Sequence, residues 1–146
     1  MTTPTAPQFK VRPARRGDAS PIVTLLAEVG ATGDSSAVTW IISHPEMELI
    51  VAADSLDKVI GVVSLSHRPL MKLGGRAAMI DELVVAKAWR RRGVGRELLK
   101  RAVERAKVLS VKRLEIHSLE KLDEGVTAFM AACGFAQADI GVFRLR

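Results

Sequence analysis

Seven consecutive residues of this chain carry four arginines and two glycines: residues 90–96 are RRRGVGR. If a helix begins there, its first backbone N–H groups have no partners within the helix, and the helix dipole adds partial positive charge. Gly93 and Gly95 have no Cβ atom, so an anion can approach those N–H groups closely while the arginines surround it with full charge. The segment therefore predicts a binding site for a phosphate or a pyrophosphate.

The flanking sequence predicts the elements that would position this loop. Residues 78–85 (AMIDELVV) are mostly aliphatic and too few for a helix of their own, which indicates a buried strand. After the loop, apolar residues recur at steps of three and four, as on one face of a helix. This stripe consists of Val94, Leu98, Leu99, Ala102, Val103, Ala106 and Leu109. The predicted unit is a strand, a basic glycine-containing loop and an amphipathic helix.

Two familiar phosphate loops are excluded. The segment has no Gly-Lys-Ser/Thr ending, so it is not a P-loop, and it lacks the three-glycine spacing of a dinucleotide-binding fingerprint. Taken alone, the heptapeptide is equally compatible with a basic helix start whose glycines serve only the turn.

Length and composition indicate one globular domain over residues 1–146, with residues 1–6 as a flexible tail. No apolar run reaches the length of a membrane span and the N-terminus has no signal-peptide pattern, so we expect a cytoplasmic protein that does not bind membranes. Cys133 has no cysteine to pair with in this chain, and three well-separated histidines predict no metal site.

The charge is concentrated around the loop. Residues 87–113 hold 11 of the 22 lysines and arginines but only two acidic residues, Glu97 and Glu104. Such a focus attracts nucleic acid, acidic membranes or a polyphosphate cofactor. Aromatic residues make up 4% of the chain and none lies between the arginines of the loop, so no platform for stacking bases is visible and nucleic acid is the less favoured partner.

Hydrophobic patterns predict the remaining elements. We expect strands at residues 9–15, 47–54, 59–67, 76–85 and 112–118, and short closing strands around a turn at residues 139–141. We expect one helix after Gly17 with Asp18 as its N-cap, one that begins at Asp34 or Ser35 and ends before Pro45, and one at residues 123–132. The strands before the basic loop would form an antiparallel meander, and the helix after the loop would lead to a parallel neighbour.

Both the loop and the order of elements resemble the GNAT acetyltransferase superfamily. Its R/Q-x-x-G-x-G/A signature is matched by Arg90, Gly93 and Gly95, and the resemblance extends over nearly the whole chain, most densely over residues 78–135. It implies an α/β (α+β) acyl-CoA N-acyltransferase fold, with a mixed, twisted sheet of six to seven strands and about four helices.

The resemblance also implies a cofactor site for acetyl-CoA. The loop would hold the pyrophosphate, and the pantetheine arm would enter between two splayed parallel strands and bond to main-chain groups. A backbone N–H of Val84 or Val85 would face the thioester oxygen. The cofactor-binding residues implied in this way are Leu83, Val84, Val85, Arg91, Arg92, Gly93, Val94, Gly95 and Arg96.

In such an enzyme, acetyl-CoA donates its acetyl group directly to a primary amine. The amine must first lose its proton, and a lysine-like amine has a pKa of about 10.4, so a carboxylate is the usual base. Glu82 and Glu115 are the two candidates for that base, followed by Asp81. Each could equally be a surface or ion-paired carboxylate.

The last helix departs from the family pattern. Met130 stands where many members have a tyrosine that protonates the departing thiolate, and Asp123 stands where they have an asparagine. Methionine cannot donate a proton. Water could replace the tyrosine, whereas Cys133, His67 and His117 are less favoured substitutes. The alternative function is a non-catalytic acyl-CoA-binding regulatory module.

Two features leave partners open. Trp40 could line the acceptor pocket, but we expect it to pack on the inner face of its helix. Residues 142–145 (VFRL) could form a strand edge that pairs with a second subunit, so a homodimer is possible. The amine acceptor cannot be identified from the sequence.

Overall fold

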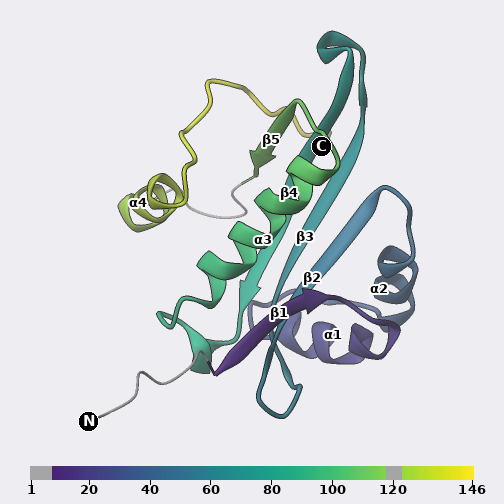
Figure 1. Cartoon of the computed structure of the whole chain (residues 1–146), viewed down its shortest axis with the longest axis vertical. Helices are drawn as coiled ribbons and strands as arrows, with labels where there is room; N and C mark the ends of the chain where they lie inside the picture. Colours follow the sequence, from purple (N-terminus) through teal and green to yellow (C-terminus); the bar gives the residue numbers. More distant parts are fainter. Residues whose placement is uncertain (1–7, 118–122) are drawn as a thin grey trace.

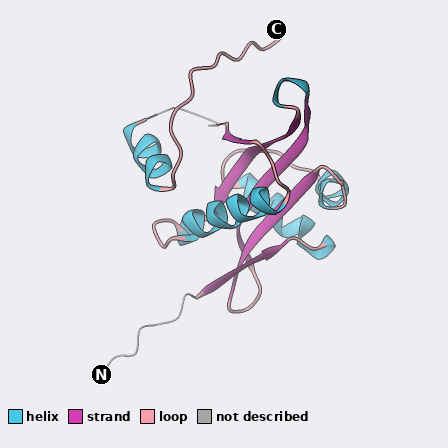
Figure 2. Cartoon of the chain, turned by 45° about the horizontal axis from the view of Figure 1, so that its top comes forward, coloured by secondary structure: helices cyan, strands magenta, loops and turns pink. Residues whose placement is uncertain are grey.

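The computed structural model describes residues 8–117 and 123–146. A mixed sheet of five strands lies between helix α3 on one face and helices α1 and α2 on the other, and α4 lies beyond the β5 side of the sheet (Figures 1 and 2). The strands are β1 (Phe9–Pro13), β2 (Met47–Asp54), β3 (Val59–Leu70), β4 (Gly75–Val85) and β5 (Arg113–Ile116). The helices are α1 (Ala19–Ala27), α2 (Ser35–Ile42), α3 (Val94–Val108) and α4 (Glu124–Ala132).

The sheet has the order β1-β2-β3-β4-β5. Neighbouring strands are antiparallel as far as β4, and β4 and β5 are parallel. The predicted meander, the crossover through α3 and the α+β fold class are confirmed. The last residue of the predicted strand 112–118 and the predicted tail 1–6 lie outside the described residues.

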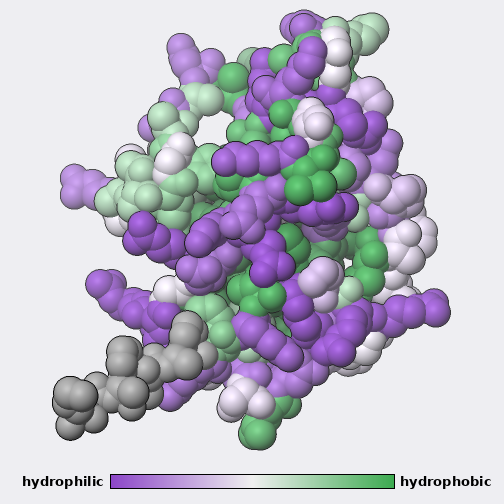
Figure 3. All heavy atoms as spheres, viewed as in Figure 1, coloured by the Kyte–Doolittle hydropathy of each residue, from purple (hydrophilic) through white to green (hydrophobic). Residues whose placement is uncertain are grey.

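Each face of the sheet has its own core. Ile60, Val63 and Leu65 of β3 pack with α3, whereas Val59 and Val62 pack with α1 and α2. From Gly61 onwards the two faces alternate with the period of two along a strand, and the β-bulge at Ile60 shifts this alternation by one residue. On α3 the residues predicted to face the core at positions 94, 98, 99, 102 and 106 are buried. Its outward side is hydrophilic, as the band of purple side chains in Figure 3 shows.

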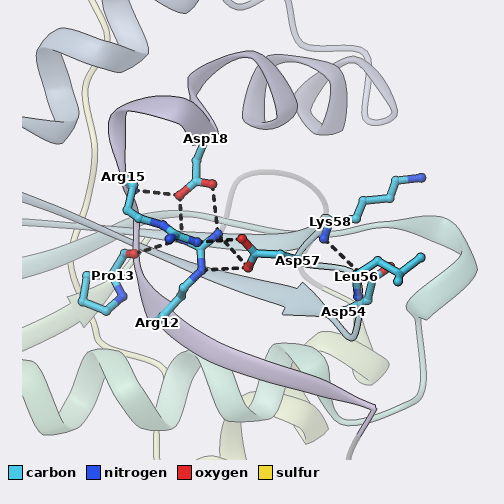
Figure 4. A network of polar contacts seen from close by, with 8 residues as sticks. All are labelled: Arg12, Pro13, Arg15, Asp18, Asp54, Leu56, Asp57 and Lys58. Carbon is cyan, nitrogen blue, oxygen red and sulfur yellow. Dashed lines mark hydrogen bonds and ion pairs between the residues drawn. The ribbon is translucent and has the colours of Figure 1, made fainter.

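Asp18 precedes α1, as predicted, but its side chain does not cap that helix. Its carboxylate instead accepts two hydrogen bonds from the Arg12 guanidinium, at 2.7 and 3.0 Å, and one from the Arg15 backbone N–H at 2.7 Å (Figure 4). Asp57, in the turn between β2 and β3, pairs with the same two arginines. The network ties β1 to the entrance of α1.

Two other predictions were wrong. Residues 136–146 form no strand, so the described sheet has five strands instead of six or seven. An alternating sequence forms a strand only beside a partner, and Phe143 here is 98% exposed. Trp40 is 64% exposed because the buried position of its short helix is Val38, two residues away and therefore on the opposite side.

No helix among the described residues is long and apolar enough to cross a membrane.

Candidate functional site

The sheet opens between β4 and β5. The two strands pair only from Ala77 to Ile80 of β4, opposite Arg113 to Ile116 of β5, and His117 donates the last hydrogen bond to the Ile80 carbonyl at 3.2 Å. Strand β4 continues for five more residues without β5 beside it. A cavity of about 580 Å³ lies at this opening. Its walls come from the end of α1, from β4, from the loop after β4, from the end of β5 and from α4.

Backbone groups of β4 point into the opening. The backbone N–H of Ala86 donates a hydrogen bond to the Ile60 carbonyl of β3 at 2.8 Å. Val84, two residues before Ala86, lies opposite Val62 of β3, two residues after Ile60. Because successive residues of an antiparallel strand point their backbone groups to opposite sides, those of Val84 face β3. Those of Leu83 and Val85 face the side that β5 has left. Of the two N–H groups expected to face a thioester oxygen, the one on Val85 is therefore available.

The basic loop ends at an uncapped helix start. Gly93 is the N-cap residue of α3, with a φ of 84° that favours glycine, and no side chain of the described residues caps the helix. The first intrahelical hydrogen bond there runs from the Glu97 N–H to the Gly93 carbonyl at 3.1 Å. The N–H groups of Val94, Gly95 and Arg96 precede it and have no acceptor within α3. The free N–H groups expected at the start of this helix are thus present, and phosphate binding by them stays a prediction.

The loop arginines point in different directions. Arg90 lines the opening beside β4 and donates from Nε to the Val85 carbonyl at 3.4 Å. Arg92 and Arg96 instead line a second cavity of about 520 Å³ between β1 and the start of α3. There the Arg92 guanidinium lies 5.0 Å from the centre of the Trp89 ring. Sequence analysis missed this aromatic neighbour, although Trp89 lies only three residues before Arg92.

Gly95 faces α4 across a narrow space. A Cβ atom built on Gly95 would lie 3.6 Å from the Phe129 ring and 3.7 Å from the Val85 side chain, which are ordinary van der Waals contacts. This glycine has no strained φ, so its role is to leave the surface of α3 open between Val85 and α4.

Glu82, one of the two predicted bases, lines the β4–β5 cavity. Burial of its carboxyl within the cavity and the charge of the adjacent Asp81 raise the pKa of Glu82, and the nearby Ser64 hydroxyl opposes that rise. The residue as a whole stays solvent-accessible, so a bound amine or water can reach the carboxylate. A raised pKa makes a carboxylate a stronger base near neutral pH.

Glu115 does not line this cavity. On β5 the neighbouring residues Leu114 and Ile116 pack towards the α3 side, so Glu115 lies on the other face of the sheet, which is also the face of Glu82. Glu115, however, lies opposite Met79, within the stretch where the two strands are still paired. Of the two predicted bases, only Glu82 lies at the opening between the strands.

Three further titratable groups, Glu28, Asp81 and His117, lie at the cavity, and of these only Glu28 had no signal in the sequence. Glu28, just past the end of α1, accepts a hydrogen bond from the Lys87 backbone N–H at 2.9 Å, which joins α1 to the loop after β4. Asp81 accepts a hydrogen bond from the Ser66 hydroxyl at 2.9 Å. His117 lines the wall at the end of β5. Three carboxylates from two separate elements therefore face the same cavity.

Helix α4 contributes an apolar wall through Val126, Phe129 and Met130. No hydroxyl stands at position 130, as the sequence indicated. The Asp123 carboxylate accepts a hydrogen bond from the Val126 N–H at 2.8 Å and so caps α4. An aspartate at this position thus has a structural explanation.

The remaining titratable candidates lie elsewhere. Cys133 packs against the core on the α3 side of the sheet and does not line the cavity. His67 is buried, and its Nδ1 accepts a hydrogen bond from Arg76 at 3.1 Å. Among the residues that the structure describes, no group of three or more histidine, cysteine, aspartate or glutamate side chains could hold a metal ion.

Comparison with known proteins connects this geometry to a family. The profile of the acetyltransferase (GNAT) family matches residues 22–135. No curated protein sequence matches the chain significantly.

Solved structures share the fold at low sequence identity. An aminoglycoside acetyltransferase from an uncultured soil metagenomic sample is 16% identical with a TM-score of 0.81, over 95% of this chain and 96% of that one. The ribosomal-protein-alanine N-acetyltransferase of Brucella melitensis biovar Abortus is 20% identical with a TM-score of 0.78, over 94% and 98% of the two chains. A transcriptional regulator from Bacillus halodurans is 22% identical with a TM-score of 0.81, over 94% and 99%.

Proposed function

Because the chain belongs to the acetyltransferase (GNAT) family, whose members use acetyl-CoA as cosubstrate, we propose that it transfers the acetyl group of acetyl-CoA to a primary amine. The acceptor attacks the thioester directly in a ternary complex. The observation that carries this proposal is the opening between β4 and β5, with free backbone groups along β4 and the uncapped start of α3 at its end.

Acetyl-CoA would use main-chain contacts along its length. Its pyrophosphate binds the first N–H groups of α3 beyond Gly93, and its pantetheine arm bonds the backbone groups of Leu83 and Val85. The Val85 N–H donates to the thioester oxygen and stabilises the oxyanion of the tetrahedral intermediate. These contacts depend on backbone geometry, so they tolerate the unusual side chains of this sequence.

Glu82 is the proposed general base. It takes a proton from the acceptor ammonium, directly or through one water molecule, and the neutral nitrogen then attacks the thioester carbon. When the tetrahedral intermediate collapses, the C–S bond breaks and CoA leaves as a thiolate. A thiol has a pKa of about 8.5, so this thiolate can leave without an acid at position 130. The acetylated nitrogen loses its remaining extra proton to water, and the thiolate takes a proton from water in turn, which leaves a neutral amide and CoA thiol.

The acidic side of the cavity supports a cationic acceptor. Glu28, Asp81 and Glu82 line it together, and their charges favour an ammonium group over a neutral or anionic substrate. This feature fits small amines, aminoglycosides and peptide N-termini alike. All three classes belong in a first substrate screen. Aminoglycosides and peptides are included because one structural neighbour is named an aminoglycoside acetyltransferase and another a ribosomal-protein-alanine N-acetyltransferase.

A second candidate function is an acyl-CoA-binding module without turnover. Met130 favours it, since the helix that faces the cavity offers no proton donor at that position. Asp123 no longer supports it, because the cap of α4 explains that residue. The two functions predict the same cofactor binding and differ only in turnover.

Calorimetric titration with acetyl-CoA and with CoA tests the cofactor site first. Gly95→Glu would place a carboxylate between Val85 and α4, whereas Gly95→Ala is the matched control because a Cβ atom fits there. We expect micromolar binding to the wild type and to Gly95→Ala, and none to Gly95→Glu. Absence of binding to the wild type would overturn both candidate functions.

Turnover of an amine panel then separates the two candidates. We expect Glu82→Gln to lower kcat by roughly 10²-fold or more, whereas Glu115→Gln should leave it nearly unchanged, because only Glu82 lies at the cavity. Tight binding without turnover of any amine would favour the non-catalytic module.

A further inference from the structure

Two serines on β3 face two carboxylates on β4. Ser64 lies opposite Glu82 in the strand register, and the register shifts immediately after Ser64 so that Leu65 lies opposite Ile80. Asp81 is therefore the extra residue of a bulge in β4. Ser66, on the same face of β3 as Ser64, donates its hydrogen bond to Asp81 at 2.9 Å. Bulges redirect side chains, and this one brings both carboxylates to the same cavity.

Ser64 is the unsatisfied member of this group. It is 5% exposed, and its hydroxyl has no hydrogen-bond partner among the described residues. A buried hydroxyl without a partner is uncommon in a folded protein and calls for an explanation. The neighbouring Ser66 shows that a serine on this face of β3 can reach a β4 carboxylate.

Glu82 is the group that the Ser64 hydroxyl can reach. The two residues are directly opposite each other across the strand pair. Burial and the Asp81 charge raise the pKa of Glu82, whereas the Ser64 hydroxyl acts to lower it. Residues directly opposite each other in an antiparallel pair have Cβ atoms about 4.5–5.5 Å apart, a separation that a serine hydroxyl and a glutamate carboxylate can bridge.

Resting on the proposed function, we propose that Ser64 is a positioning residue that donates a hydrogen bond to the ionised Glu82 carboxylate and holds it against the β4 wall of the cavity. One carboxylate oxygen is then fixed by Ser64 and the other is left for the acceptor ammonium. When Glu82 has taken the proton, the Ser64 hydroxyl can turn and accept a hydrogen bond instead.

Other titratable and charged groups line the cavity together with Glu82. They are Asp81 on the same strand, Glu28 after α1, Lys87 and Arg90 in the loop after β4, and His117 after β5. A test must therefore distinguish the effect of the Ser64 hydrogen bond on the Glu82 carboxyl from the electrostatic effect of these charges. Ser66→Ala is the matched control, since it removes a serine from the same face of β3 and the same neighbourhood without touching the Ser64–Glu82 pair.

The experiment is an NMR titration of the Glu82 carboxyl carbon in the full chain, assigned by its loss in Glu82→Gln. We expect the pKa of Glu82 to be higher in Ser64→Ala than in the wild type, since a donor to the charged form is lost. Ser64→Thr, which keeps the hydroxyl on a residue suited to strands, should restore it. Ser66→Ala should not raise it. An unchanged pKa in Ser64→Ala would overturn the proposal.

Kinetics with an accepted amine give the second measurement. In Ser64→Ala the acid limb of the kcat/KM profile should move to higher pH together with the carboxyl titration. We expect kcat near neutral pH to fall about tenfold, the size of a hydrogen bond to a charged group, with KM for acetyl-CoA unchanged. If no amine is acetylated, the proposed function fails, while the NMR titration still decides whether Ser64 binds Glu82.

Discussion

Gly61 of β3 lies directly beneath Val94, the first residue of α3. A Cβ atom on Gly61 would come within 3.0 Å of Val94 Cγ1 and of Leu98 Cδ1, and within 3.3 Å of the Val84 carbonyl oxygen. The helix can approach the sheet this closely only because position 61 has no side chain. The approach fixes the start of α3, with its free N–H groups, at the end of β4 where the strands separate.

Gly61→Ala should therefore move the start of α3 away from the sheet. We expect a loss of about 1–3 kcal/mol in the free energy of unfolding, as for overpacked cores, together with weaker binding of acetyl-CoA. Urea unfolding and calorimetry measure the two effects. Gly17→Ala is the control, because nothing lies within 4 Å of an added Cβ atom there. Equal stability of both variants would contradict this account of the helix position.

The pairing of Asp18 with Arg12 predicts a pH dependence of stability. Burial acts to raise the pKa of Asp18, but the hydrogen bonds from Arg12 and from the Arg15 backbone, with the charges of both arginines, outweigh it and lower the pKa below 3.8. A carboxyl whose pKa is lowered by folding contributes stability above its unfolded pKa, and that stability is lost as the pH falls through its folded pKa.

Asp18→Asn should thus be less stable than the wild type by about 1–3 kcal/mol at pH 7, and the difference should shrink as the pH falls below about 4. Urea unfolding across that range measures it. Asp57→Asn removes a carboxylate that also pairs with these arginines but is 49% exposed, so we expect a cost below about 1 kcal/mol. A difference that stays constant with pH would argue against the role of the Asp18 charge.

Met130 provides a test of leaving-group chemistry. Its side chain lines the β4–β5 cavity, so Met130→Tyr would bring a hydroxyl to the place where the departing thiolate forms. We expect kcat to rise in Met130→Tyr, since a general acid contributes on the order of 10²- to 10⁴-fold when protonation limits the rate. Met130→Phe, which has the same ring without the hydroxyl, should show no gain. Equal kcat in the two variants would mean that the thiolate leaves without help.

The division of the arginines between two cavities predicts which part of the cofactor each one serves. Arg92 and Arg96 lie on the β1 side of α3, away from the opening beside β4. We expect Arg96→Ala to weaken binding of acetyl-CoA about tenfold, as for a lost charged hydrogen bond, and to leave binding of acetyl-pantetheine, which lacks the nucleotide phosphates, unchanged. Arg90→Ala should weaken both ligands, because Arg90 lines the cavity that would hold pantetheine. Calorimetric titration of both ligands against each variant measures this.

The sequence by itself determined the elements and their order. The pattern of apolar residues predicted the observed bounds of β2 and the buried stripe of α3. Such predictions succeed because the spacing of side chains along one face follows from the local geometry of a single strand or helix. The loop glycines and arginines likewise predicted an anion site, which depends on backbone N–H groups at a helix start and therefore on local sequence. Where a pattern needed a distant partner, as in the closing strands, the prediction failed.

Only the tertiary structure decided which residues share the site. Glu82 and Glu115 looked equivalent in the sequence, and only the pairing of β4 with β5 shows that Glu115 lies within the paired stretch whereas Glu82 lies beyond it, at the cavity. Glu28 and Ser64 had no signal at all, since each comes from another element: Glu28 lines the cavity from the end of α1, and Ser64 lies opposite Glu82 in the β3–β4 register. Such neighbours are brought together by packing between segments far apart in the chain, which no local pattern encodes.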